Sequence, residues 1–273
     1  MSNHVLTEKE IIDKKFTASK NGYNPFEVDK FLENLLKCKR KLVFFDLEGT
    51  QTTQEIIAIA AIKVTLDAKY NVKKIDEKTF KKYVKSQGEI GPVVTKLTGI
   101  NEELLDDLGV DYKEAFDAFI NYIGKDFANC AFVAYGGYDK KLFFETCKVN
   151  DEYRMDDVKV IASNYVDLSL FISKFMKDDK NNLLSLTECV EYLGGSFKGL
   201  KHDPMADAIN LVQIYDLFTK NKTIVKDRYK KLISNDPKLP KPLVNVIKKL
   251  NSGQNVTPKD FQQYIDDYLK WLS

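Results

Sequence analysis

The stretch LVFFDLEGT, residues 42–50, passes from four apolar side chains into two carboxylates. A short apolar run of this kind predicts a strand buried on both faces of a sheet, with its chemistry at the carboxyl end. Side chains two positions apart on a strand share a face, so Asp46 and Glu48 should point the same way. We therefore expect this strand to lie within the central sheet of the fold.

Two carboxylates at the end of an apolar strand repel one another and are costly to remove from water. A divalent cation removes both penalties, and hard oxygen ligands suit Mg²⁺ or Mn²⁺. Asp46 and Glu48 alone also fit a strand end whose carboxylates are simply solvated, because Asp-x-Glu is a short and common pattern.

Strand-like and helix-like patterns follow one another between about residues 41 and 220. Strands are predicted at 42–50, 54–64, 78–86 and 130–135. Helices are predicted at 111–123, 141–147, 185–195 and 203–218. Strands first, then strands alternating with helices, indicate an α/β domain with a mixed sheet flanked by helices.

Two further places carry candidate chemistry. Asp139 follows the predicted strand 130–135 and opens a helix, where a carboxylate is electrostatically stabilised with or without a catalytic role. His202 precedes Asp203 and Pro204, which fit the cap and first position of a helix that carries Asp207 in its first turns. The chain has 2 histidines, and the other lies at position 4. A loop histidine and a helix carboxylate can converge there on one site.

Taken together, the motifs FFDLEGT, AYGGYDKKLF and GLKHDPMADA resemble the DEDD superfamily of 3′–5′ exonucleases in its histidine-containing branch, DEDDh. The segment IGPVVTKLTGI, residues 90–100, is similar to the family segment that ends in Leu-Thr-Gly-Ile. Where the commoner middle motif has asparagine, this chain has Tyr135. That version looks like the branch of RNA 3′-exonucleases related to the siRNA- and histone-mRNA-trimming enzymes and to bacterial KapD.

This resemblance implies an RNase H-like fold over residues 40–220 and a two-metal hydrolysis of phosphodiesters. It implies two Mg²⁺ or Mn²⁺ ions held by Asp46, Glu48, Asp139 and Asp207, with His202 as general base and nucleoside 5′-monophosphates as products. By family analogy, the contacts to the terminal nucleotide are assigned to Leu47, Gly49, Thr50, Leu97, Thr98, Gly99, Ile100 and Tyr135.

The N-terminal residues 1–39 read as a short helical segment. Residues 6–36 resemble the N-terminal module of the DivIVA/GpsB division proteins, which implies a protein partner or a membrane-associated partner. No long heptad run follows, so a helical hairpin packed on the nuclease is the alternative.

The C-terminal residues 221–273 read as a helical, basic extension. Ten Lys or Arg and two Asp lie between residues 220 and 250. Such a stretch fits either a guide for a phosphate backbone or a solvated surface in a lysine-rich protein.

Composition narrows the class of protein. The 273 residues are 44% hydrophobic and 30% charged, with a net charge of +2, which excludes wholesale disorder. The 4 cysteines are scattered, which argues against a disulfide framework or a thiolate zinc site. The sequence predicts no transmembrane segment and no signal peptide, and hence a cytoplasmic location.

The sequence therefore predicts a metal-dependent 3′–5′ exonuclease for single-stranded RNA or DNA, with RNA favoured by the branch it resembles. Two alternatives stay open: a DivIVA-like adaptor whose nuclease domain holds nucleic acid without cutting it, and a DNA-proofreading exonuclease.

Overall fold

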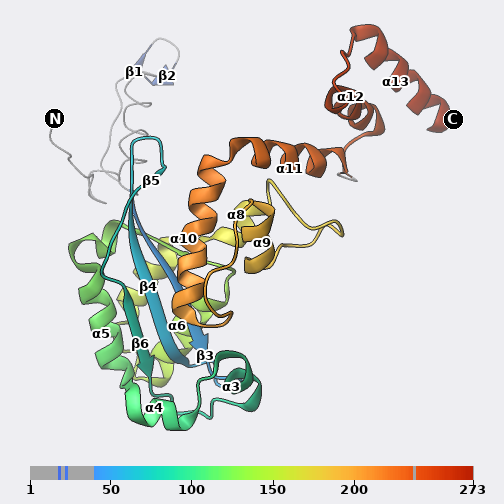
Figure 1. Cartoon of the computed structure of the whole chain (residues 1–273). Helices are drawn as coiled ribbons and strands as arrows, with labels where there is room; N and C mark the ends of the chain where they lie inside the picture. Colours follow the sequence, from blue (N-terminus) through green and yellow to red (C-terminus); the bar gives the residue numbers. More distant parts are fainter. Residues whose placement is uncertain (1–17, 20–21, 24–39, 236–237, 273) are drawn as a thin grey trace.

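The computed structural model describes residues 18–19, 22–23, 40–235 and 238–272. Its main body is a twisted mixed sheet with helices on both faces (Figure 1). The strands are β3 (Lys41–Gly49), β4 (Ile56–Leu66), β5 (Val72–Ile75), β6 (Phe80–Val84), β7 (Gly109–Val110), β8 (Ala131–Ala134) and β9 (Tyr165–Asp167). They lie in the order β7-β6-β4-β3-β8-β9, and β5 pairs with β4.

The predicted strand at 42–50 is confirmed as the centre of this sheet. β3 pairs antiparallel with the long strand β4 and parallel with β8. Because its side chains alternate between faces, Val43 and Phe45 pack into one hydrophobic core, while Leu42 and Phe44 pack into the other. Each core is closed by helices, so β3 is buried on both faces.

Helices cover the two faces of the sheet in the order of the chain. On one face lie α5 (Tyr112–Ile123), α6 (Tyr138–Val149) and α7 (Met155–Ser163). On the other lie α8 (Leu168–Ile172), α9 (Leu186–Tyr192) and α10 (Pro204–Lys220). Each of the four predicted helical ranges overlaps one observed helix, namely α5, α6, α9 or α10, which confirms those predictions.

The predicted strand at 54–64 begins two residues late. Gln54 has a left-handed φ of 58°, and the backbone N–H groups of Thr50 and Glu55 donate to the Glu55 carbonyl and the Thr50 hydroxyl. These bonds close a tight turn, so the strand starts only at Ile56. That strand ends at Leu66 and so keeps its predicted length, whereas the predicted strand at 78–86 is shortened to β6, to which pairing with β4 is confined.

Two short helices at the end of the molecule near the β3 carboxyl end were not predicted. They are α3 (Pro92–Thr98) and α4 (Glu102–Leu108). α4 is capped by the Asn101 side chain, which accepts from the Leu104 N–H at 2.9 Å. Ile90, Ile100 and Leu105 anchor this region in a third hydrophobic cluster.

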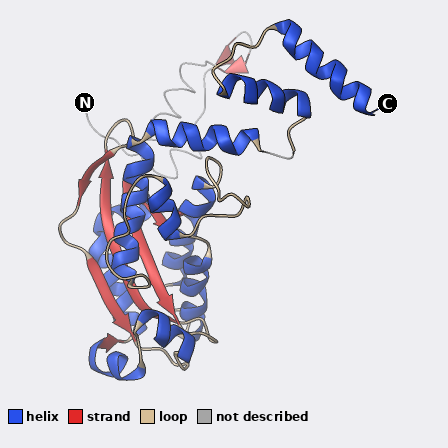
Figure 2. Cartoon of the chain, turned by 45° about the vertical axis from the view of Figure 1, so that its right-hand side comes forward, coloured by secondary structure: helices blue, strands red, loops and turns tan. Residues whose placement is uncertain are grey.

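Outside this body, the structure describes a short antiparallel pair near the N-terminus and three C-terminal helices. The pair is β1 (Ala18–Ser19) with β2 (Gly22–Tyr23). The helices are α11 (Lys222–Ser234), α12 (Lys241–Asn251) and α13 (Pro258–Leu272), and Figure 2 shows them extending away from the sheet. Apart from β1 and β2, the predicted helical segment 1–39 lies outside the described residues. No described helix combines the length and apolar character that a membrane crossing requires.

Gly49 brings the end of β3 against α6. A Cβ atom at this position would lie 2.5 Å from Leu142 Cδ2 and 3.2 Å from the Glu55 carbonyl oxygen. Leu142 is fully buried, so its side chain has little space into which it can move. The absence of a side chain at residue 49 thus sets the approach of the helix that carries Asp139.

We expect Gly49→Ala to lower the free energy of unfolding by about 1–3 kcal/mol through overpacking. Gly137→Ala is the matched control, because a Cβ there meets nothing within 4 Å, and its stability should change by less than about 1 kcal/mol. Urea denaturation of both variants measures the difference. Equal stability of the two would refute close packing at Gly49.

Candidate active site

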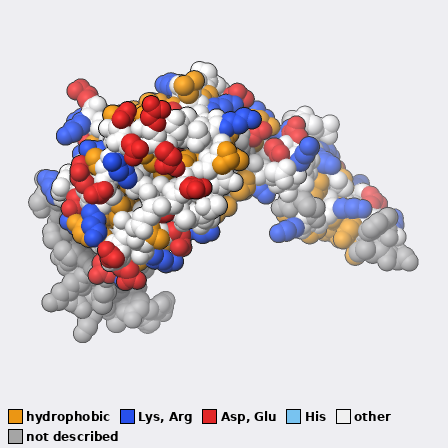
Figure 3. Space-filling view, turned by 90° about the horizontal axis from the view of Figure 1, so that it is seen from below, with side chains coloured by type: hydrophobic (Ala, Val, Ile, Leu, Met, Phe, Trp, Pro, Cys, Tyr) orange, Lys and Arg blue, Asp and Glu red, His pale blue; other side chains and the backbone are white. Residues whose placement is uncertain are grey.

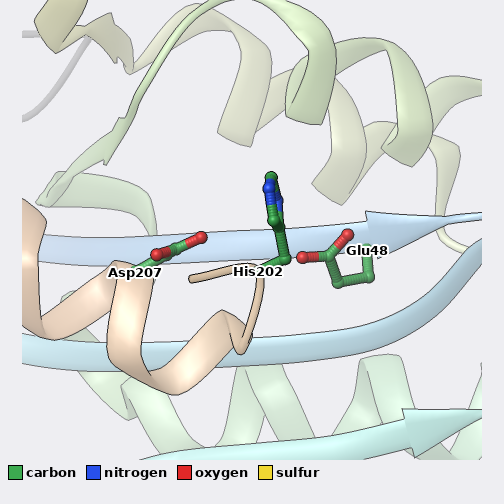
Figure 4. A group of neighbouring side chains, drawn as sticks. All are labelled: Glu48, His202 and Asp207. Carbon is green, nitrogen blue, oxygen red and sulfur yellow. The ribbon is translucent and has the colours of Figure 1, made fainter. Parts of the chain in front are cut away.

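Three elements bring the predicted site residues together. Asp46 and Glu48 end β3, Asp139 opens α6, and Asp207 lies in the first turn of α10. Glu48, Asp207 and His202 each place a possible ligand atom within 4.8 Å of the others. Figure 4 shows the His202 ring standing between the two carboxylates.

The alternation of β3 explains this convergence. Asp46 and Glu48 have the same parity as Leu42 and Phe44, so they share the face of the sheet on which α10 packs. The apolar side chains of Leu42 and Phe44 hold α10 against β3. Asp46 and Glu48 lie two and four residues after Phe44, so they face the same helix. Asp207 therefore meets them without any special loop.

Asp139 is fixed by the backbone of β3. Its Oδ1 accepts the Leu47 N–H at 3.0 Å, at a point where β3 has run past the last paired residue of β8. Its side chain is 5% exposed and lies in the first turn of α6, where the helix dipole favours negative charge. The Asp139 carboxylate is thus both a structural partner of β3 and a member of the cluster.

Burial and mutual repulsion raise the carboxylate pKa values. With all causes combined, the pKa of Glu48 is raised to about 8 and that of Asp139 to about 7, and burial is the largest cause for both. The charges of Asp207 and Asp139 contribute to the shift of Glu48, whereas the hydrogen bond from the Leu47 N–H lowers the pKa of Asp139 and so limits its shift. The pKa of Asp46 is also raised well above its usual value, by burial and then by the charge of Asp139.

The pKa of Asp207 is raised less than that of Glu48 or Asp139. Burial raises its pKa to about 6, and the adjacent His202 opposes that shift. Its Oδ1 is buried and has no hydrogen-bond partner among the described residues. A buried acceptor without a partner is rare in a folded protein and calls for a bound ion or water.

This donor set fits a divalent cation. All four carboxylates offer hard oxygen ligands, and they lie in a partly dehydrated site where each one disfavours the ionisation of its neighbours. The Asp207 oxygen that lacks a partner could coordinate a cation at the centre, whose positive charge would offset the repulsion among the four carboxylates. The metal-ligand role that the sequence predicts for these residues stays a prediction, and their oxygen donors are chemically suited to it.

The backbone next to the site holds His202 in an unusual conformation. His202 is exposed and has a left-handed φ of 62°. The following residue, Asp203, caps α10 by accepting the Met205 and Ala206 N–H groups, both at 2.9 Å. Its other oxygen pairs with Lys81 Nζ of β6 at 2.6 Å. The sequence indicated the cap, but the ion pair with a strand more than a hundred residues away carried no sequence signal.

The residues predicted to contact substrate fall into two groups. Leu97, at the end of α3, is 51% exposed, and Gly99 caps that helix in the left-handed conformation. Ile100, by contrast, is 2% exposed and belongs to the third hydrophobic cluster. Thr98 uses its hydroxyl within the turn, as an acceptor from the Ile100 N–H and a donor to the Val94 carbonyl.

Near the end of β3, Leu47 is 5% exposed and Thr50 is fully buried. The Thr50 hydroxyl accepts the Glu55 N–H and shares a hydrogen bond with the Thr53 hydroxyl. Gly49 is also buried, against α6. The side chains of Leu47 and Thr50 are therefore used in packing and in the turn. At these two positions and at Gly49, only backbone atoms remain to contact a substrate.

Tyr135 lies at the margin of the site, and its role is local. Its hydroxyl donates to the Leu184 carbonyl at 2.8 Å, which ties the end of β8 to the loop before α9. The neighbouring Gly136 has φ 99°, and its N–H donates to Asp167 Oδ1 at 3.1 Å. Tyr165 also donates to the Gly136 carbonyl. Sequence reasoning missed Asp167 and Tyr165, because neither belongs to a recognisable motif.

Comparison with known families identifies the class of protein. The exonuclease family model, RNase_T, matches residues 43–215, which is more than half of the chain. The chain therefore belongs to the exonuclease family, and the predicted enzyme class is confirmed. The match begins after the segment that resembles DivIVA/GpsB, so that resemblance stays a prediction. No curated protein matches the chain.

Several solved structures share the fold. The nuclease domain of 3′hExo, described as a DEDDh family member bound to rAMP, is 17% identical with a TM-score of 0.54, covering 67% of this chain and 93% of that one. A full-length 3′-exonuclease is 16% identical with a TM-score of 0.52, and the match covers 67% of this chain and 62% of that chain. E. coli exonuclease I in complex with a dT13 oligonucleotide is 18% identical with a TM-score of 0.51, covering 72% and 44%. These likenesses confirm the RNase H-like fold.

The raised pKa values give the metal-free protein a pH-dependent stability. Between about pH 4, where free carboxyl groups ionise, and pH 8, the folded state holds more protons than the unfolded state. Stability must therefore fall as pH rises across this window. We expect the melting temperature in a chelator to decrease from pH 5.5 to pH 8.5.

Asp46→Asn removes one charge from the cluster and should raise the metal-free melting temperature at pH 8, by about 2–4 °C for each kcal/mol of repulsion relieved. Asp106→Asn, on the exposed surface of α4, is the control and should leave the wild-type pH profile unchanged. Thermal denaturation across this pH range measures both. A wild-type profile that rises with pH would contradict the repulsion described here.

Proposed function

We propose that this protein is a 3′–5′ exonuclease that removes nucleoside 5′-monophosphates from single-stranded nucleic acid, with RNA as the favoured substrate. The observation that carries the proposal is the convergence of four carboxylates and one histidine at the carboxyl end of β3. The preference for RNA rests on the middle motif around Tyr135 and Asp139, which resembles the RNA-trimming branch of the family.

In this proposal Asp46, Glu48, Asp139 and Asp207 hold two Mg²⁺ or Mn²⁺ ions. When bound, a pair of such ions stabilises the negative charge that develops on the attacking and leaving oxygens of a phosphodiester. The Leu47 N–H and the N-terminus of α6 orient Asp139. The packing around the cluster holds the four carboxylates close to one another. The orphaned oxygen of Asp207 is the atom most in need of a cation.

His202 is assigned as the general base. Histidine exchanges protons near neutral pH, and an imidazole nitrogen of His202 lies within reach of the atoms of Glu48 and Asp207 that would hold a cation. The ring accepts a proton from the attacking water and releases it to bulk solvent, to which the side chain is open. The left-handed backbone and the Asp203 cap hold the ring over the carboxylates.

Of the substrate contacts predicted from the family, the exposed Leu97 is the side chain best placed to meet a terminal base. Backbone groups of Gly49 and Gly99 are proposed to approach the sugar and phosphate. The cytoplasmic location, and a membrane-associated or protein partner for residues 6–36, remain predictions from the sequence.

An RNA and a DNA of the same sequence, each labelled at the 5′ end, test the proposal directly. With Mg²⁺ we expect stepwise shortening from the 3′ end, faster for RNA, because the ions and the carboxylates act on the terminal phosphodiester. Asp46→Ala should abolish shortening. Faster shortening of DNA would favour a proofreading enzyme. Intact 3′ ends with both proteins would favour the adaptor hypothesis.

His202→Asn separates proton transfer from folding. Asparagine tolerates the left-handed conformation that residue 202 adopts, so the loop should keep its shape. Losing a general base should lower kcat by about 10²–10⁴-fold with little change in KM. Steady-state kinetics at pH 7.5 measure the effect, and circular dichroism confirms folding. A kcat within about threefold of wild type would exclude His202 as the base.

A further inference from the structure

A basic groove lies beside α11, at the far end of α10 from the candidate active site. The cavity measures about 480 Å³ and lies between the loop that precedes α9 and one face of α11. Figures 1 and 2 show this loop reaching toward α11, which leaves the upper end of α10. Its charged lining consists of Lys177, Asp178, Asp179, Lys180, Arg228 and Lys231.

The two carboxylates of the groove are already engaged. Asp178 accepts the backbone N–H groups of Lys180 and Asn182 at 2.9 and 2.6 Å, so it serves to fold the loop. Asp179 pairs with Lys231 Nζ at 2.7 Å, which joins the loop to α11. Within the described ranges, no ion pair uses Lys177, Lys180 or Arg228. Three cations thus remain for an anionic ligand.

Aromatic rings lie next to the groove, outside its lining. The Arg228 guanidinium lies 4.1 Å from the centre of the Tyr192 ring, which fixes its plane while its N–H donors stay available. Next to it, Tyr229 is 43% exposed and packs against Phe175, with ring centres 5.8 Å apart. Cations beside exposed aromatic rings are typical of surfaces that bind single-stranded nucleic acid.

The opposite end of the molecule is rich in acidic side chains. Figure 3 shows acidic side chains gathered across the end formed by α3 and α4, with Lys and Arg scattered among them. α4 itself, EELLDDL, contains four carboxylates and no basic residue. The surface of α4 repels a polyanionic strand, so basic residues elsewhere on the molecule would strengthen the binding of the part of the strand that lies outside the metal site.

We propose that the α11 groove binds the phosphate backbone of the same single strand whose 3′ end lies in the active site. This inference rests on the proposed function. Tyr135 anchors Leu184 at the site margin, and Asp179 anchors the same loop to α11, so one loop connects the two regions. Lys220 lies about 20 Å from Asp207 along α10, a span of about six nucleotides in a stacked strand.

The structure also changes which basic residues carry this role. Lys230 and Lys231 belong to the basic stretch between residues 220 and 250, but Lys230 pairs with Asp227 at 3.7 Å and Lys231 pairs with Asp179. The free cations are Arg228 on α11 and two lysines of the loop, Lys177 and Lys180, which lie outside the basic C-terminal stretch. The combined variant Lys177→Gln/Lys180→Gln/Arg228→Gln therefore removes the groove charge without breaking a described ion pair.

The test compares oligonucleotides of 4 and 12 nucleotides, in the nucleic acid that the wild type degrades faster. The triple variant should lose about tenfold in kcat/KM on the 12-mer at low salt, because only that strand reaches the groove. Its kcat/KM on the 4-mer should stay within about twofold of wild type. The control is Lys73→Gln/Lys78→Gln/Lys125→Gln, which removes the same charge from exposed lysines elsewhere and should retain both activities.

Binding of a fluorescent 12-mer in a chelator gives a readout independent of hydrolysis. The slope of log Kd against log salt should be smaller by about 2 in the groove variant than in the control, for three lost phosphate contacts. Equal slopes, or equal losses on both substrate lengths, would overturn the groove. If the wild type and both variants leave every substrate uncut but the slopes differ, the proposed exonuclease function is wrong, whereas binding of nucleic acid by the groove is supported.

Discussion

The rest of the structure depends on one electrostatic constraint: four carboxylates are held together at the end of a buried strand. Burial and like charge raise the pKa values of Glu48 and Asp139 to about 8 and 7, so the carboxylate cluster by itself opposes the stability of the fold at neutral pH. The surrounding architecture can be understood as the means of holding these groups in place. It does so through backbone donors, helix termini and close packing.

Each element that brings a carboxylate is fixed independently of the charge it carries. β3 is fixed by two hydrophobic cores, α6 by its packing against Gly49 and by Leu142 in one of these cores, and α10 by apolar side chains on the same face as Asp46. Asp203 completes α10 through its cap and its ion pair with Lys81. The site therefore keeps its geometry without relying on attraction among its own residues.

Sequence patterns correctly predicted the elements that depend on residues close together in the chain. The apolar run at 42–50, the helical spacing at 111–123 and the cap at Asp203 all appear in the structure as expected, and the family resemblance correctly gave the fold class. What escaped prediction depends on distant partners: the Lys81–Asp203 pair, the Asp167–Gly136 bond and the groove between a loop and α11. The helices at 92–98 and 102–108 were missed because they are short and stabilised by one cap and a small hydrophobic cluster.

The central claim is that divalent cations relieve the repulsion within this cluster. Calorimetric titration of Mn²⁺ at pH 7, in two buffers with different ionisation enthalpies, gives both the number of ions bound and the protons released. Because Glu48 and Asp139 hold protons near neutral pH in the metal-free fold, the account predicts two bound ions and net proton release in the wild type. Binding without proton release, or binding equally strong after Asp46→Asn, would contradict it.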